Sequence, residues 1–145
     1  ATGKLLPAIL TVATGLLGTS YEPDLTGAIL AFEDVTEAPY RLDRMLTHWR
    51  MLGKFDQIAG IALGRFSQCE PPVNVPSFSA QEVLQERLGD LGVPIVANLP
   101  FGHDGENAVL PFGIQAKIEA NPDGTGLLLF PDYGATPLQR INYPR

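Results

Sequence analysis

The sequence has 145 residues and a formal net charge of −6, with 45% hydrophobic and 18% charged residues. This length suits one domain with a hydrophobic core of its own. The charge argues against a nucleic-acid binder, because phosphate neutralisation needs clustered Lys and Arg, and the ten basic residues are scattered. No apolar run approaches the ~20 residues that cross a bilayer. The single cysteine, Cys69, excludes an internal disulfide and a cysteine metal cluster, and it fits a reducing compartment.

The first segment is predicted to be a short extended stretch followed by a helix. Gly3 to Leu6 has the pattern of an extended chain, and Pro7 can open a helix at its first position, where the missing N–H costs nothing. Apolar residues then recur at helical spacing as far as Leu17, and Gly18 is a plausible end. We therefore expect a helix from Pro7 to Leu17.

Two apolar runs flank the clearest helix of the sequence. The run Gly27 to Phe32 predicts a buried strand that ends at Glu33 and Asp34. The helix that follows carries an apolar stripe at i, i+3, i+4, i+7 spacing. The stripe consists of Leu42, Met45, Leu46, Trp49 and Leu52. Gly53 closes this helix, and the run Ile58 to Phe66 predicts a second buried strand.

A capping box marks the start of the next helix. Ser79 is followed three residues later by Glu82, which is the pattern of a reciprocal side-chain cap. The helix is expected to run to about Gly89. Residues 93–97 then predict a third short strand, followed by a loop that carries His103.

The last third of the sequence changes character. Short strands are predicted over 107–110, 113–119 and 126–130, separated by Pro, Gly, Asn and Asp turns. The earlier alternation of strand and helix favours a parallel sheet, whereas these segments favour antiparallel hairpins. The predicted fold class is therefore an α/β domain with a mixed sheet over residues 1–133. The tail, 134–145, has no clear period and is expected to pack over the domain or remain mobile.

Two residues at expected strand ends are candidates for acid–base chemistry. Glu33 follows a predicted strand, and ligands gather at the carboxyl ends of parallel strands. His103 follows the third strand at the same expected edge, and a loop histidine is a natural proton carrier. Each has a plainer interpretation, a solvated strand end for the carboxylate and no chemical role for a single histidine. His48 lies on the polar side of its helix and is expected to be exposed.

A Glu–His pair can act as the orienting group and the base of a nucleophilic triad. Such a pair needs a nucleophile, and no serine stands in a Gly-x-Ser-x-Gly elbow. The serines are Ser20, Ser67, Ser77 and Ser79. Cys69 lies in a proline-flanked loop with no close basic neighbour except Arg65, which does not favour a thiolate. The triad is therefore incomplete within this sequence.

Six segments form an ordered series of motifs. They are Gly18-Thr-Ser-Tyr-Glu-Pro-Asp-Leu25, Gly27-Ala-Ile-Leu-Ala-Phe-Glu-Asp-Val35, Pro39-Tyr-Arg-Leu-Asp-Arg-Met-Leu-Thr47, Ala59-Gly-Ile-Ala-Leu-Gly-Arg-Phe66, Leu88-Gly-Asp-Leu-Gly-Val-Pro94 and Leu99-Pro-Phe-Gly-His103. In this order and with these gaps they resemble the second domain of serine LD-carboxypeptidases, the murein tetrapeptide carboxypeptidases related to microcin C self-immunity peptidases. The resemblance covers nearly the whole chain from Gly3 to about Phe130.

The resemblance implies a fold, an activity and two residue roles. The fold would be a single compact domain of the swivelling β/β/α type. Glu33 and His103 would be the carboxylate and the base of a Ser-His-Glu triad, whose serine belongs to an amino-terminal domain outside this sequence. The family's reaction is hydrolysis of the bond between a diamino acid and the terminal D-alanine of murein tetrapeptides, in cytoplasmic murein recycling, with no metal or cofactor. The chain alone is then expected to be inactive.

One segment departs from the family pattern. Where the family usually has Gly-Gly-Asn before Leu-Thr-Val, this sequence has Pro7-Ala8-Ile9. Glycines permit close backbone approach, and an asparagine side chain can hydrogen-bond near an active site. The substitution removes both options and adds apolar surface.

Two other functions stay open from the sequence. The first is an excised or engineered scaffold domain that associates with itself and has no catalytic role, because a domain separated from its partner exposes apolar surface. A small-ligand-binding module is the second, and it rests only on the concave strand-end edge. The expected partners are the missing amino-terminal domain, a murein peptide and further copies of the chain in a homo-oligomer. Nucleic acid and membrane are not expected partners.

Overall fold

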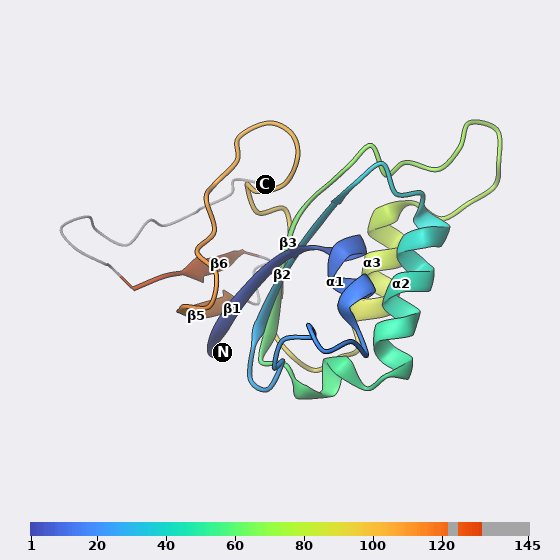
Figure 1. Ribbon diagram of the computed structural model, residues 1–145. Coiled ribbons are helices and arrows are strands. Elements are labelled where there is room, and N and C mark those ends of the chain that lie inside the picture. The colour runs from blue at the N-terminus through green and yellow to red at the C-terminus, as the bar shows by residue number, and fades with distance from the viewer. Residues whose placement is uncertain (122–124, 132–145) are drawn as a thin grey trace.

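The computed structural model describes residues 1–121 and 125–131, which form a six-stranded sheet with helices on one face (Figure 1). In chain order the elements are β1 (Thr2–Ile9), α1 (Leu10–Leu16), β2 (Ile29–Val35), α2 (Pro39–Met51), a 3-10 helix η1 (Lys54–Gln57), β3 (Gly60–Ser67), α3 (Ala80–Leu88), β4 (Ile95–Val96), β5 (Gln115–Ala120) and β6 (Gly126–Leu129). The strand order is β4-β3-β2-β1-β5-β6. Strands β4 to β1 are parallel, and β5 and β6 are antiparallel to their neighbours. The predicted α/β domain with a mixed sheet is confirmed.

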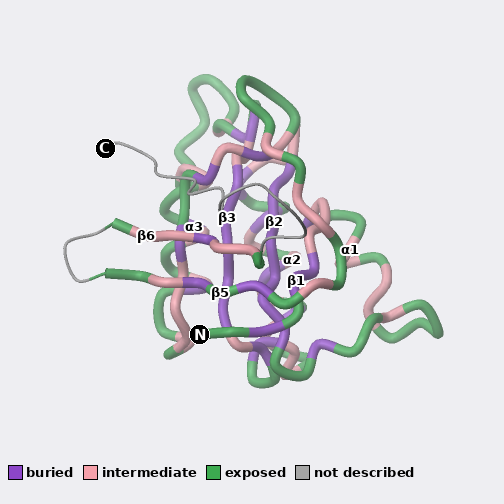
Figure 2. Tube along the Cα trace, turned by 90° about the vertical axis from the view of Figure 1, so that its left-hand side faces the viewer, coloured by how far each residue is buried: buried purple, intermediate pink, exposed green. Residues whose placement is uncertain are grey.

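The β5–β6 hairpin extends the sheet beyond β1 and curls back over its open face. Figure 2 shows the hairpin in front of the buried central strands, and β5 and β6 both contact β4 at the opposite edge. Glycines make this approach possible. A Cβ on Gly60 would lie 2.8 Å from Ile118 Cγ2, and one on Gly126 would lie 2.6 Å from Val96 Cγ2. The curled sheet encloses one of the two hydrophobic cores, on the face opposite the helices.

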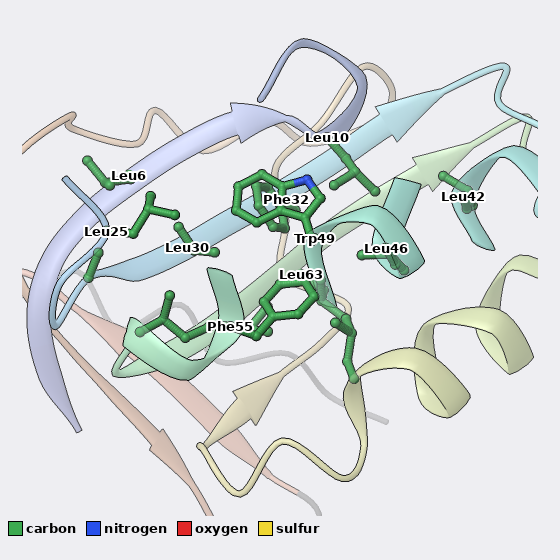
Figure 3. Packing of buried hydrophobic residues seen from close by; sticks show 14 of the residues in the cluster. Leu6, Leu10, Leu25, Leu30, Phe32, Leu42, Leu46, Trp49, Phe55 and Leu63 are labelled. Atoms are coloured by element: carbon green, nitrogen blue, oxygen red, sulfur yellow. The ribbon is translucent and has the colours of Figure 1, made fainter. Parts of the chain in front are cut away.

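The other core lies between the sheet and the helices and is centred on aromatic side chains (Figure 3). The rings of Phe32 and Trp49 form a T-shaped pair with centroids 5.2 Å apart, and Trp49 stacks on Phe55 at 5.6 Å. The indole N–H of Trp49 donates to Thr14 Oγ1 at 2.9 Å. Such pairs add stability beyond the area they bury, and the hydrogen bond to Thr14 satisfies the buried indole donor.

The central helix α2 confirms most of the predicted apolar stripe. Leu42, Leu46 and Trp49 are buried, and Met45 is partly buried against the same core. Leu52 is exposed, because the helix ends at Met51 and the chain turns away there. The predicted capping box is also confirmed at the start of α3.

The first segment corrects the predicted helix. Pro7 does not open a helix but lies within β1, and α1 begins only at Leu10. The backbone N–H of Leu5 donates to Ile114 O, on the side of β1 that faces away from β2. Strand geometry turns the nitrogen of Pro7 the same way, beyond the last pair with β5 at Lys4 and Gln115, so its missing N–H interrupts no ladder. The apolar run that suggested one helix is therefore shared between a buried strand and a short helix.

The strands predicted late in the sequence are partly corrected. Residues 107–110 form no strand, because the backbone N–H of Ala108 donates to Pro100 O at 2.6 Å and closes a loop instead. The predicted strand over 93–97 is reduced to Ile95–Val96. Strands β5 and β6 appear within two residues of their predicted bounds. The predicted tail over 134–145 lies outside the described residues.

The α3 cap supports a stability prediction. Ser79 Oγ accepts from the Glu82 N–H at 3.2 Å, and Glu82 Oε2 accepts from the Ser79 N–H at 2.7 Å. Replacing Ser79 with alanine is expected to lower the free energy of unfolding by about 1 kcal/mol, measured by urea denaturation. Ser77→Ala is the control, because that exposed hydroxyl bonds only to the neighbouring Phe78 carbonyl. Equal losses in both variants would contradict a capping role.

Candidate active site

The structure brings the two candidate residues into direct contact. His103 Nδ1 lies 2.8 Å from Glu33 Oε2, although the residues are far apart in the sequence. The carboxylate side chain is 11% exposed, and the imidazole is 42% exposed. One partner is thus held within the fold, and the other borders solvent.

Glu33 lies inside β2 rather than beyond its end, which corrects the predicted strand boundary. It pairs in register with Ile9 of β1. Between Phe32 and Asp34, the pairing with β3 shifts, because β2 advances two residues while β3 advances three. Bulges of this kind redirect side chains and are frequent beside active sites. The end of the apolar run marked the strand end wrongly, because a buried carboxylate does not interrupt a backbone ladder.

The side chain of Glu33 shares a face of the sheet with Ile29 and Ala31, which belong to the core enclosed by the curled sheet. Residues two apart in a strand point to the same side, so Glu33 faces away from the helices. The loop that carries His103 lies over this face. A Cβ on Gly102 would lie 3.3 Å from Glu33 Oε2, and its φ of 137° is open to glycine.

The contact with Glu33 favours the protonated form of the imidazole. The hydrogen bond to Glu33, followed by the negative charge of the same carboxylate, raises the pKa of His103 above the ordinary value of 6.5, and burial opposes this only in part. Asp34 and Asp104 add smaller effects in the same direction. The pair can therefore hold Nδ1 with its proton toward the carboxylate and stabilise an imidazolium when the other ring nitrogen accepts a proton.

The neighbouring carboxylate, Asp34, accepts hydrogen bonds from the backbone and from Thr11 instead of facing the histidine. Asp34 is 2% exposed, and its Oδ2 accepts from both the backbone N–H and the hydroxyl of Thr11 at 2.8 Å. Its Oδ1 accepts from the Val35 N–H at 2.8 Å. Because these bonds anchor the start of α1, Asp34 caps a helix while Glu33 faces the histidine. The sequence did not separate these two roles.

The other candidates do not join the pair. His48 is exposed on α2, and Ser79 caps α3. Cys69 is buried, and burial raises the pKa of its thiol, which disfavours the thiolate. Across residues 1–121 and 125–131, no group of three or more His, Cys, Asp or Glu side chains is arranged to hold a metal ion, and no helix is long and apolar enough to cross a membrane.

A hollow of about 530 Å³ opens beside the pair. Glu33, His103 and Asn107 give it polar groups, and the rest of the lining is largely apolar. The apolar lining includes Pro7, Ala8, Ile9, Ala31 and Leu110. The segment Pro7-Ala8-Ile9, which departs from the family pattern, therefore borders the same hollow as His103.

Two residues that position the histidine loop were missed in the sequence. Arg65 and Asn107 both hydrogen-bond to this loop, and Asn107 Oδ1 accepts from the Gly102 N–H at 3.3 Å. The available signal was the charge of Arg65 within an otherwise apolar predicted strand. Asn107 gave none, because its segment had the composition of a strand.

Known proteins match the chain in sequence and in structure. The LD-carboxypeptidase C-terminal domain family matches residues 2–118. A putative carboxypeptidase of Synechocystis sp. is 58% identical over 121 residues, which are 83% of this chain and 40% of that protein. The murein tetrapeptide carboxypeptidase of Pseudomonas aeruginosa is 36% identical over 82% of this chain and 37% of its own length. The crystal structure of muramoyltetrapeptide carboxypeptidase from Oxalobacter formigenes aligns with a TM-score of 0.81 at 31% identity, over 92% of this chain and 47% of that one.

The chain therefore belongs to the LD-carboxypeptidase C-terminal domain family, and the resemblance seen in the sequence is confirmed. It spans 37% to 40% of the length of the two curated relatives named above.

Proposed function

We propose that this chain is the part of a serine LD-carboxypeptidase that supplies the carboxylate and the base of a Ser-His-Glu triad. The 2.8 Å contact between His103 Nδ1 and Glu33 Oε2 carries the proposal. A carboxylate in this position selects the imidazole tautomer and stabilises the imidazolium formed during attack. The remaining ring nitrogen would take the proton of a serine hydroxyl, and that serine comes from an amino-terminal part of the protein.

The proposed substrate is a murein tetrapeptide, cleaved in the cytoplasm between its diamino acid and the terminal D-alanine. Support comes from the relatives named for murein tetrapeptide and muramoyltetrapeptide carboxypeptidase activity. The hollow beside His103 is open enough to admit an extended peptide end. No step of the proposed reaction calls for a metal or a cofactor, because acyl transfer to serine needs only the triad and donors for the oxyanion.

Complementation tests this function. We expect the chain alone to release no D-alanine from murein tetrapeptide, and the same chain combined with the amino-terminal half of a family member to release it. In that mixture His103→Ala should abolish release, whereas His48→Ala, which changes an exposed histidine on α2, should leave it unchanged. Release that survives His103→Ala would rule out the proposed base.

The expected homo-oligomer and the alternative of a non-catalytic scaffold remain predictions. Sedimentation at several concentrations distinguishes them from a monomer that needs only its amino-terminal partner.

A further inference from the structure

We propose that Arg65 is a positioning residue whose guanidinium forms the centre of loop 100–108 and thereby holds His103 against Glu33. An effect of Arg65 on catalysis rests on the proposed function. The contact between β3 and the loop does not, and its effect on His103 can be measured in the chain alone.

The chain leading into the loop is anchored to β3 at Leu63 and at Arg65 itself. The backbone N–H of Arg65 donates to Phe101 O at 2.8 Å, and that of Leu99 donates to Leu63 O at 3.0 Å. These bonds extend the parallel pairing beyond β4. They bring the chain to Gly102 directly above the bulge in β3, with His103 as the next residue.

The guanidinium then fills the centre of the loop. Nη1 of Arg65 donates to the carbonyl oxygens of both Asp104 and Glu106, and Nε lies 3.9 Å from Asp104 Oδ1. Gly105 packs against it: a Cβ there would lie 3.1 Å from Nη1, and its φ of 62° favours glycine. The loop backbone therefore bends around a planar group with several fixed donors, which a flexible ammonium cannot reproduce.

Beyond β3, the loop contacts a strand through His103, whose Nδ1 lies 2.8 Å from Glu33 Oε2 of β2. Bonds within the loop include the Ala108 N–H to Pro100 O at 2.6 Å and the Gly102 N–H to Asn107 Oδ1 at 3.3 Å. Both lie at the base of the loop. Apart from the bond between His103 and Glu33, the tip is held among the described residues by the two carbonyls that accept from Arg65.

The two ways in which Arg65 could act, through its positive charge or by holding the loop, predict opposite changes in the pKa of His103 when Arg65 is replaced. The charged groups that act on His103 are Glu33 and Asp34 from β2 and Asp104 from the loop, and Arg65 of β3 lies beside Asp104. If Arg65 acted only through its positive charge, removing it would raise the pKa of His103. When Arg65 holds the loop in place, removing it separates the imidazole from Glu33 and lowers that pKa towards 6.5.

The experiment follows the imidazole signals of the 145-residue chain by NMR as a function of pH. In Arg65→Met and Arg65→Lys we expect the pKa of His103 to fall, and in a reconstituted enzyme we expect kcat to drop by about 10²-fold, the effect of a misplaced catalytic group. Arg50→Met is the matched control, because Arg50 makes the same kinds of bond, to the carbonyl of Arg87 and to Asp90, at the α2–α3 contact. It should leave the pKa of His103 and kcat unchanged.

If the pKa of His103 rises or stays constant in both Arg65 variants, Arg65 does not position the loop. If Arg65→Met does not fold, the pKa measured in Arg65→Lys is the test. Either result leaves the Glu33–His103 contact intact. By contrast, if the pKa of His103 were the same in Glu33→Gln as in the wild type, the proposed triad itself would be overturned.

Discussion

In an enzyme reconstituted with an amino-terminal partner, Glu33→Gln is expected to lower turnover by about 10²- to 10⁴-fold, the range contributed by positioned acid–base groups. Glutamine is nearly the same size as glutamate and fits the same place in β2, but it carries no charge. The imidazolium that forms as the serine attacks then loses its ionic partner. An amide facing Nδ1 also no longer selects one tautomer of the ring.

The same variant should change the pH dependence of turnover. A general base works as the neutral imidazole, so activity falls on the acid side as the ring becomes protonated. Glu33 raises the pKa of His103, and its removal should therefore move the acid limb to lower pH. The sign also applies to stability: this contact contributes fully below the ordinary pKa of 6.5, and the contribution is lost as the pH rises through the higher pKa of the folded state.

Glu22→Gln is a matched control for this variant. Its carboxylate is also poorly exposed and pairs with Lys54 rather than with a histidine. We expect turnover and its pH profile to stay as in the wild type. A Glu33→Gln enzyme with the wild-type acid limb would show that the carboxylate does not act on His103.

The sequence was sufficient where a single periodic pattern decides the structure. Helix α2 follows from an apolar stripe, and the start of α3 follows from the reciprocal side chains of Ser79 and Glu82. The approach of Glu33 to His103 was expected because both residues lie close to the carboxyl ends of strands in the same parallel sheet. Each of these features depends on local chemistry or on a general rule of sheet topology.

The sequence was insufficient where distant segments compete for the same residues. Pro7 fits the first position of a helix, and a strand accepts it because the pairing of β1 with β5 stops at Lys4. Asp34 was predicted to mark a strand end, whereas its hydrogen bonds to Thr11 of α1 make it a helix cap. Arg65 acquires a role only when the loop bends around it. Such contacts join residues far apart in the chain, and no local pattern encodes them.

Gly64 offers the second large effect, because it lies beneath the histidine loop. A Cβ on this residue would lie 2.5 Å from two ring carbons of Phe101 and from its carbonyl oxygen. Neither the backbone oxygen nor the buried ring can yield without moving the chain that continues into His103. Gly64→Ala should therefore lower the free energy of unfolding by about 1–3 kcal/mol, as overpacking does, and lower reconstituted turnover by about 10²-fold through displacement of the imidazole.

Gly15→Ala distinguishes this effect from a general intolerance of side chains. Gly15 lies in α1, and a Cβ there meets nothing within 4 Å, so alanine should be neutral or stabilise the helix by up to about 1 kcal/mol. Urea denaturation and D-alanine release measure the two consequences separately. If Gly64→Ala lost stability but kept full turnover, Phe101 would have moved without His103, and the loop would be less rigidly joined to β3 than its hydrogen bonds indicate. Loss of both means that packing under the loop fixes the catalytic geometry, with Gly64 below and Arg65 at its centre.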